Sequence, residues 1–186
     1  MRNLPNILTL CRILAVPALC ICFWIPAQMG DWLALGIFTI AAATDFFDGW
    51  VARKFDAQSG FGRMLDPIAD KLIVATSLIL LVAHDVIVGL NLIAAIIILC
   101  REILVSGLRE FLMETQIRLP VSALAKYKTT IQVIAIAILL SDEAGEALLA
   151  GTHIIGLTLL WVAAGITLAT GYDYVQQGIR HADWKN

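Results

Sequence analysis

Residues 32–53 read WLALGIFTIAAATDFFDGWVAR, an uncharged run from Trp32 to Thr44 that ends in two aspartates and an arginine. A helix of roughly 20 residues crosses the ~30 Å hydrocarbon core of a bilayer. Because open backbone cannot be hydrogen-bonded in lipid, this run predicts a membrane-spanning α-helix. An isolated charge in hydrocarbon costs at least ~2.5–3.5 kcal/mol, so the charged end must lie at a boundary or find a partner.

Five more apolar stretches of similar length accompany this one, separated by turn-forming or polar residues. The six approximate ranges are 5–25, 32–53, 67–85, 88–111, 124–141 and 149–174. The 186-residue chain is 60% hydrophobic and 15% charged, with a mean hydropathy of +0.84. A soluble domain is nearer about half apolar and about a quarter charged. The sequence therefore predicts an all-α polytopic membrane protein, a single domain over 1–186 with six transmembrane helices.

Lysine and arginine are distributed unevenly between the two sides that this topology creates. The connections near 26–31, 84–89 and 141–151 contain no Lys or Arg, and hold the acidic residues Asp31, Asp85, Asp142, Glu143 and Glu146. The basic residues fall at the N-terminus, in the other connections and span ends, and in the C-terminal tail. The positive-inside rule then predicts that both termini are cytoplasmic. We expect a bacterial inner (plasma) membrane, with the charged site facing the cytoplasm.

Four aspartates stand at the cytoplasmic ends of the second and third spans. Asp45 and Asp48 are three residues apart and Asp66 and Asp70 are four apart, so each pair shares one helix face. The short connection 54–62 folds the spans into an antiparallel hairpin that sets the pairs side by side. Converging carboxylates repel one another unless cations lie between them, and all-oxygen ligands suit Mg²⁺ or Mn²⁺. We predict a two-metal site, which suits displacement at phosphorus.

A simpler interpretation is that the aspartates are ordinary surface charges at helix ends, with no bound metal. Asp66 in particular could be a favourable charge near a helix start. The glycine and arginine at fixed positions around the aspartates argue against this interpretation.

The aspartates belong to a longer pattern, D-x-x-D-G-x-x-A-R, eight residues, then G-x-x-x-D-x-x-x-D. Its fixed positions are Asp45, Asp48, Gly49, Ala52, Arg53, Gly62, Asp66 and Asp70. The pattern resembles the signature of the CDP-alcohol phosphotransferase family, with no position missing. The resemblance implies six membrane helices and a reaction in which a hydroxyl attacks the β-phosphorus of a CDP-linked lipid and CMP leaves. It also implies that the four aspartates hold two metal ions and that Asp70 is the general base. The nucleotide-binding residues implied are Gly49, Ala52, Arg53 and Gly62.

The N-terminal segment 3–12, NLPNILTLCR, resembles the opening of phosphatidylglycerophosphate synthases and of cardiolipin synthases in the same superfamily. That resemblance places the segment near the nucleotide and makes Asn6 and Thr9 candidate binding residues. An ordinary helix start explains Pro5 equally well, so both interpretations stay open.

Basic residues suited to an anionic acceptor lie at the same predicted membrane level. Arg101 and Arg109 are eight residues apart, about 80° around a helix, so they can point into one cavity. At the start of the fifth span, Lys126 and Thr130 share a face, whereas Lys128 is expected to point elsewhere. All five are candidates for binding an acceptor phosphate. The alternative is that these residues fix topology and touch anionic lipid heads.

The pattern R-E-I at 101–103, R-E at 109–110 and K-x-K-T at 126–129 most resembles phosphatidylglycerophosphate synthases within that family. Glu102 is placed to pair with one of the arginines. The resemblance implies transfer of the phosphatidyl group from CDP-diacylglycerol to glycerol 3-phosphate, with CMP released. Serine, inositol and choline carry no phosphate and need no such cations.

Three alternatives remain at this stage. A cardiolipin synthase is the alternative within the family. A divalent-cation transporter would also need membrane aspartates, but the acidic cluster lies near one face and not along a path across the membrane. A structural membrane anchor is the third. Membrane lipids and, by family analogy, a second copy of the chain are the expected partners, and no nucleic acid is expected.

Overall fold

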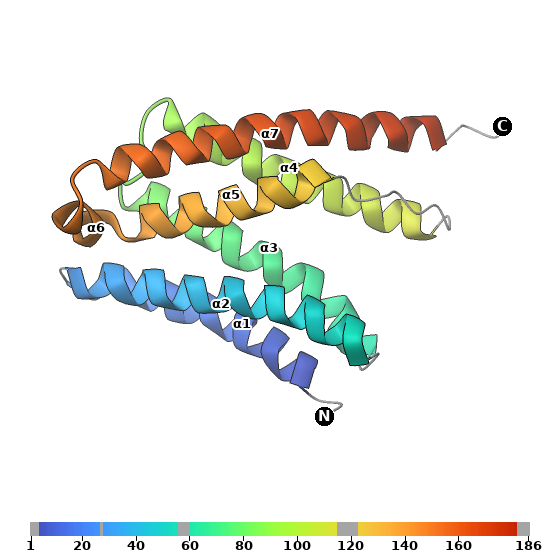
Figure 1. Ribbon diagram of the computed structural model, residues 1–186, viewed down its shortest axis with the longest axis horizontal. Coiled ribbons are helices and arrows are strands. Elements are labelled where there is room, and N and C mark those ends of the chain that lie inside the picture. Colours follow the sequence, from blue (N-terminus) through green and yellow to red (C-terminus); the bar gives the residue numbers. More distant parts are fainter. Residues whose placement is uncertain (1–3, 27, 56–59, 115–122, 182–186) are drawn as a thin grey trace.

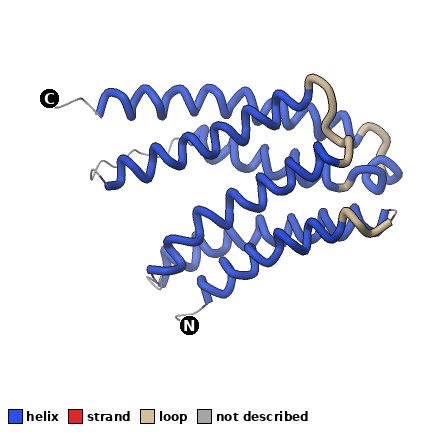
Figure 2. Tube along the Cα trace, turned by 180° about the vertical axis from the view of Figure 1, so that it is seen from behind, coloured by secondary structure: helices blue, strands red, loops and turns tan. Residues whose placement is uncertain are grey.

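The computed structural model describes residues 4–26, 28–55, 60–114 and 123–181, which form helices and short turns (Figures 1 and 2). These ranges contain no strand and seven helices. The helices are α1 (Leu4–Cys22), α2 (Gln28–Phe55), α3 (Gly60–Ala83), α4 (Asn91–Glu114), α5 (Ala123–Leu140), α6 (Asp142–Leu148) and α7 (Thr152–His181). The all-α prediction is confirmed for this part of the chain.

The six predicted apolar stretches correspond to the six long helices, but the start of the third was predicted wrongly. The sequence places it near Pro67, whereas α3 begins at Gly60 and carries Pro67 inside it. Proline is unusual inside a helix because it lacks the backbone N–H that an interior position normally donates. One turn later, Lys71 Nζ donates a hydrogen bond to the Pro67 carbonyl at 2.9 Å. Asp66 therefore lies more than a turn into α3, too far from its start to be a simple N-terminal charge.

A short helix, α6, occupies part of a predicted connection. Residues 141–151 read as a turn because they mix acidic and small residues. The structure forms α6 there with Asp142 and Glu143 in its first turn, where the helix dipole favours acidic side chains. The backbone N–H of Ala144 donates to Asp31 Oδ2 of α2 at 3.2 Å. This hydrogen bond ties α6 to the beginning of α2.

Glu146 of α6 caps the beginning of α7. Its carboxylate accepts hydrogen bonds from the backbone N–H groups of Gly151 at 2.7 Å and His153 at 3.1 Å. These hydrogen bonds hold the pKa of Glu146 below its usual range. When the pH falls through that lowered pKa, the stabilisation that the Glu146 carboxylate gives to the start of α7 is lost, because a protonated carboxyl accepts hydrogen bonds more weakly.

The long helices pack as two groups of three. α1 lies against α2 and α3, and α7 lies against α4 and α5. α5 also contacts α2 and α3 and so joins the groups. Among the described residues, no Cα atom of α4 lies within 8 Å of one of α5. α4 and α5 therefore each pack their backbones on α7 and not on each other.

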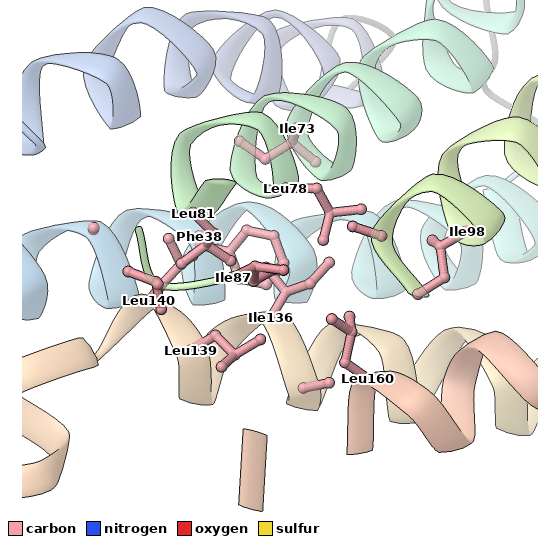
Figure 3. Packing of buried hydrophobic residues seen from close by; sticks show 14 of the residues in the cluster. Phe38, Ile73, Leu78, Leu81, Ile87, Ile98, Ile136, Leu139, Leu140 and Leu160 are labelled. Atoms are coloured by element: carbon pink, nitrogen blue, oxygen red, sulfur yellow. The ribbon is translucent and has the colours of Figure 1, made fainter. Parts of the chain in front are cut away.

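A core of fully buried apolar side chains lies where the two groups meet (Figure 3). Its central members are Phe38, Leu78, Leu81, Ile98, Ile136, Leu139 and Leu160. Many large apolar side chains point outward instead, such as Ile103 at 70% exposed and Leu90 at 78%. Two described stretches, Asn91–Glu110 and Thr152–Gln176, are long and apolar enough to span a membrane.

Both ends of the helical bundle can be identified in Figure 1. The start of α1 and the end of α7 lie toward the same end, together with the end of α2 and the start of α3. We call this the site end. The opposite end carries α6 and the turns that follow α1, α3 and α5.

Gly30 gives a stability prediction at the turn into α2. A Cβ on Gly30 would lie 2.6 Å from the Ile25 carbonyl oxygen and 2.7 Å from that of Cys22, both backbone atoms. We expect Gly30→Ala to lower the free energy of unfolding by about 1–3 kcal/mol. Gly36→Ala on the same helix is the control, because its added methyl meets nothing within 4 Å. Thermal unfolding in detergent measures both, and equal midpoints would contradict the prediction.

Candidate active site

The four predicted metal-binding aspartates lie on two successive helices that contact each other. Asp45 and Asp48 are in the second half of α2, and Asp66 and Asp70 are in the first half of α3, the halves nearer the site end. The Asp70 side chain is 50% exposed. Several other predicted site residues have side chains outside the described set. They are Asn6 on α1, Lys126 on α5, and, on α2 and α3, Asp45, Asp48, Gly49, Ala52, Arg53, Gly62 and Asp66.

The described side chains include no group of three His, Cys, Asp or Glu that could hold a metal ion. Three of the four predicted ligands are outside this set, so the two-metal site stays a prediction. The helix bounds do place all four aspartates in the connected halves of α2 and α3, in keeping with the predicted hairpin.

Helix α1 brings a buried arginine to Asp70. Arg12 is 1% exposed, and its Nη1 lies 3.8 Å from Asp70 Oδ1. A guanidinium inside an apolar bundle needs an anion, because its desolvation is costly. The sequence carries a signal for this residue, since Arg12 interrupts an apolar run just as the aspartates do. Arg12 is therefore paired with Asp70 at the candidate site.

Thr9 lies one turn before Arg12 on α1 and is 3% exposed. Three residues along a helix keep both side chains on one face. Thr9 therefore faces the bundle interior and not lipid. A nucleotide-binding role requires that direction, and so does an ordinary buried threonine.

The two arginines of α4 converge on one tyrosine of α7, in keeping with their eight-residue spacing. The guanidinium carbons of Arg101 and Arg109 lie 5.9 Å and 5.6 Å from the Tyr174 ring centroid. Arg109 Nη2 donates to Tyr174 Oη at 3.4 Å, and Arg101 Nη2 donates to Thr170 Oγ1 at 3.3 Å. The sequence analysis did not single out either α7 residue.

Lys128 is the described cation of α5 that turns into the bundle. It is 2% exposed and forms an ion pair in which its Nζ donates to Glu102 Oε1. Thr130 is exposed. Lys128 does point away from Thr130, as predicted, but its own face is the inward one. The Glu102 carboxylate on α4 explains this direction, because a buried ammonium needs an anionic partner.

Glu102 is shared between two cations. Its Oε1 also lies 3.6 Å from Arg101 Nη1, so the expected pairing with one of the arginines is observed. Arg109 lies on the other side of this group, against the Tyr174 ring, so Arg101, Arg109 and Lys128 form a basic cluster in which Glu102 pairs with two of the three cations. The Asp70 carboxylate acts electrostatically on Lys128, which connects this basic cluster with α3. Such a cluster can bind a phosphate group.

Removing the shared carboxylate should destabilise the protein. We expect Glu102→Gln to lower the free energy of unfolding by about 2–4 kcal/mol, because Lys128 would lose its anion. A double variant that also carries Lys128→Met should recover part of this loss, since no uncompensated charge stays buried. Glu110→Gln, an exposed position on the same helix, is the control. The prediction is wrong if Glu102→Gln, like Glu110→Gln, unfolds at the wild-type temperature.

Comparison with known proteins assigns the family. The model of the CDP-alcohol phosphatidyltransferase family matches residues 2–169. A CDP-diacylglycerol–glycerol-3-phosphate 3-phosphatidyltransferase of Rickettsia typhi is 44% identical over 94% of this chain and 96% of its own. Proteins of the same name from Cereibacter sphaeroides and Shigella flexneri are 39% and 37% identical, over 95% and 93% of this chain and 96% and 93% of theirs.

The matched range contains the four aspartates, Arg12 and the basic cluster. The family match and the relatives agree on one reaction class, and both cover nearly the whole chain. The protein is a transferase and belongs to the CDP-alcohol phosphatidyltransferase family.

Proposed function

We propose that this enzyme transfers the phosphatidyl group of CDP-diacylglycerol to glycerol 3-phosphate, giving phosphatidylglycerophosphate and CMP. The observation that carries the choice of acceptor is the basic cluster of Arg101, Arg109 and Lys128. An acceptor with its own phosphate needs such cations. Relatives named for this reaction are 37–44% identical. Family membership leaves the cation-transporter and membrane-anchor alternatives without support.

We propose that Asp45, Asp48, Asp66 and Asp70 hold two divalent cations, Mg²⁺ or Mn²⁺. Their carboxylate oxygens are the hard ligands that these ions prefer. The half-exposed Asp70 carboxylate is accessible to an ion from the site end. When bound, the ions supply charge neutralisation for the diphosphate and for the departing CMP.

Within this proposal each group of residues has a separate role in the reaction. Asp70 accepts the proton of the acceptor hydroxyl as that oxygen attacks the β-phosphorus. Arg12, 3.8 Å away, orients the Asp70 carboxylate. The basic cluster holds the acceptor phosphate. The proposed nucleotide-binding residues remain Asn6, Thr9, Gly49, Ala52, Arg53 and Gly62.

We further propose that all six long helices cross the bacterial inner membrane, with the site end and both termini cytoplasmic. The start of α1 and the end of α7 share the site end (Figure 1). The connections at the opposite end contain no Lys or Arg, which supports this orientation. A reporter fused to the C-terminus should be active only in the cytoplasm, and activity outside would reverse the assignment. The homodimer implied by family analogy can be tested by cross-linking in membranes.

An acceptor panel tests the proposed reaction directly. Purified enzyme with CDP-diacylglycerol and Mg²⁺ should release CMP when glycerol 3-phosphate is added. Glycerol, serine and inositol should give no release above background, because they lack the phosphate that the basic cluster binds. Release with phosphatidylglycerol instead would identify a cardiolipin synthase.

A further inference from the structure

Arg101 lies in a cradle formed by three buried residues of α7. Its Nη2 donates to Thr170 Oγ1 at 3.3 Å, and its guanidinium carbon lies 5.9 Å from the Tyr174 ring centroid. Its aliphatic part packs on Gly171, where an added Cβ would lie 3.2 Å from Arg101 Cγ. The hydroxyl, the bare backbone and the ring fix three different parts of one side chain. We call Thr170, Gly171 and Tyr174 the α7 cradle.

Tyr174 holds the second guanidinium as well. Arg109 lies 5.6 Å from the same ring centroid, and its Nη2 reaches the phenol oxygen at 3.4 Å. Two guanidiniums this close repel each other, but the negative face of an aromatic ring attracts both. Tyr174 is only 5% exposed, so it has little freedom to move. One ring therefore sets the spacing between the two arginines.

We propose that Thr170, Gly171 and Tyr174 are positioning residues that set how tightly the enzyme holds the acceptor phosphate. This proposal rests on the proposed function, because it needs Arg101 and Arg109 to bind that phosphate. Arginines held in place before binding lose less conformational freedom when the phosphate arrives. The α7 cradle carries no charge, and the family match ends at residue 169, just before it.

The first test removes the ring. Tyr174→Leu should raise the KM for glycerol 3-phosphate about tenfold, with the KM for CDP-diacylglycerol unchanged and kcat within about twofold. Tyr174→Phe keeps the ring and should restore most of the acceptor affinity. Tyr172→Leu is the matched control, since Tyr172 lies on the same helix and is 68% exposed. It should leave all three constants at wild-type values.

The second test adds one methyl group. Gly171→Ala forces the Arg101 stem to shift by a few tenths of an ångström, and should raise the acceptor KM about threefold. Gly165→Ala is its control, because a Cβ there meets nothing within 4 Å on the same helix. This pair keeps the proposal testable if Tyr174→Leu does not fold.

The outcomes separate the two proposals. A wild-type enzyme that releases no CMP with glycerol 3-phosphate overturns the proposed function. A wild-type enzyme that does so, with Tyr174→Leu and Gly171→Ala matching their controls, overturns the cradle alone. If the variants raise both KM values alike and also lower kcat and thermal stability, the α7 cradle has a purely structural role, and the cradle proposal is overturned. A selective rise in the acceptor KM, rescued by Tyr174→Phe, supports the cradle.

Discussion

Replacing Asp70 by Asn should lower kcat about 10³-fold, the size expected when a general base is lost. The amide keeps the shape of the side chain and can still contact Arg12, which lies 3.8 Å from the carboxylate. It cannot take the proton of the attacking hydroxyl. Nucleotide binding should change little, because the proposed nucleotide residues lie elsewhere on α1, α2 and α3. Steady-state CMP release and a binding assay with CMP measure the two effects separately.

The control and the Mg²⁺ dependence make this prediction specific. Asp85→Asn at the opposite end should have no effect, since Asp85 is exposed and its φ of 61° suits asparagine. If high Mg²⁺ restores the Asp70→Asn variant, Asp70 acts as a metal ligand and not as the base. Near-normal turnover at ordinary Mg²⁺ would remove Asp70 from both roles.

Truncating Arg101 should produce the second large effect. Arg101→Ala is expected to lower kcat/KM for glycerol 3-phosphate about 100-fold, because a partly buried charge that pairs with the phosphate is lost. Arg101→Lys keeps the charge but loses the planar fork and the Thr170 hydrogen bond, so about a tenfold loss is expected. The kinetics should be measured with both substrates varied, so that acceptor and nucleotide effects separate.

Phosphate-free glycerol provides an internal reference for Arg101. If Arg101 binds the acceptor phosphate, Arg101→Ala should narrow the difference in rate between glycerol 3-phosphate and glycerol. An unchanged ratio would mean that the acceptor phosphate binds elsewhere. The Lys128 and Arg109 positions would then be the next to test.

The fold was largely predictable because lipid imposes simple requirements on a chain. Apolar stretches such as 88–111 and 149–174 can only be helices in a bilayer, and α4 and α7 follow them closely. The start of α3 was missed because Pro67 reads as a helix boundary, although α3 runs through it. α6 was missed because a two-turn acidic helix has no periodic pattern to detect.

Charge in an apolar run was the signal that singled out candidate site residues in the sequence. It identified Asp70 and Arg101 as candidates, and their roles remain predictions. It did not find the direction of Lys128, because its burial depends on Glu102 from another helix. Nor did it find Tyr174, since an aromatic residue in an apolar span has many ordinary explanations. The direction of Lys128 and the contacts of Tyr174 both depend on side chains from other helices, which the sequence does not reveal.

The arrangement around α7 also has a consequence for biosynthesis. α1, α2 and α3 pack on one another, so the half of the enzyme that carries the aspartates can assemble while translation continues. α4 and α5 are linked by the Glu102–Lys128 ion pair, but both pack their backbones on α7, the last described helix to be translated. The cationic half is therefore completed last. A nascent chain stalled before α7 would carry the proposed metal-binding aspartates but would lack the Thr170 and Tyr174 contacts of Arg101, so we expect it to be inactive until that helix is synthesised.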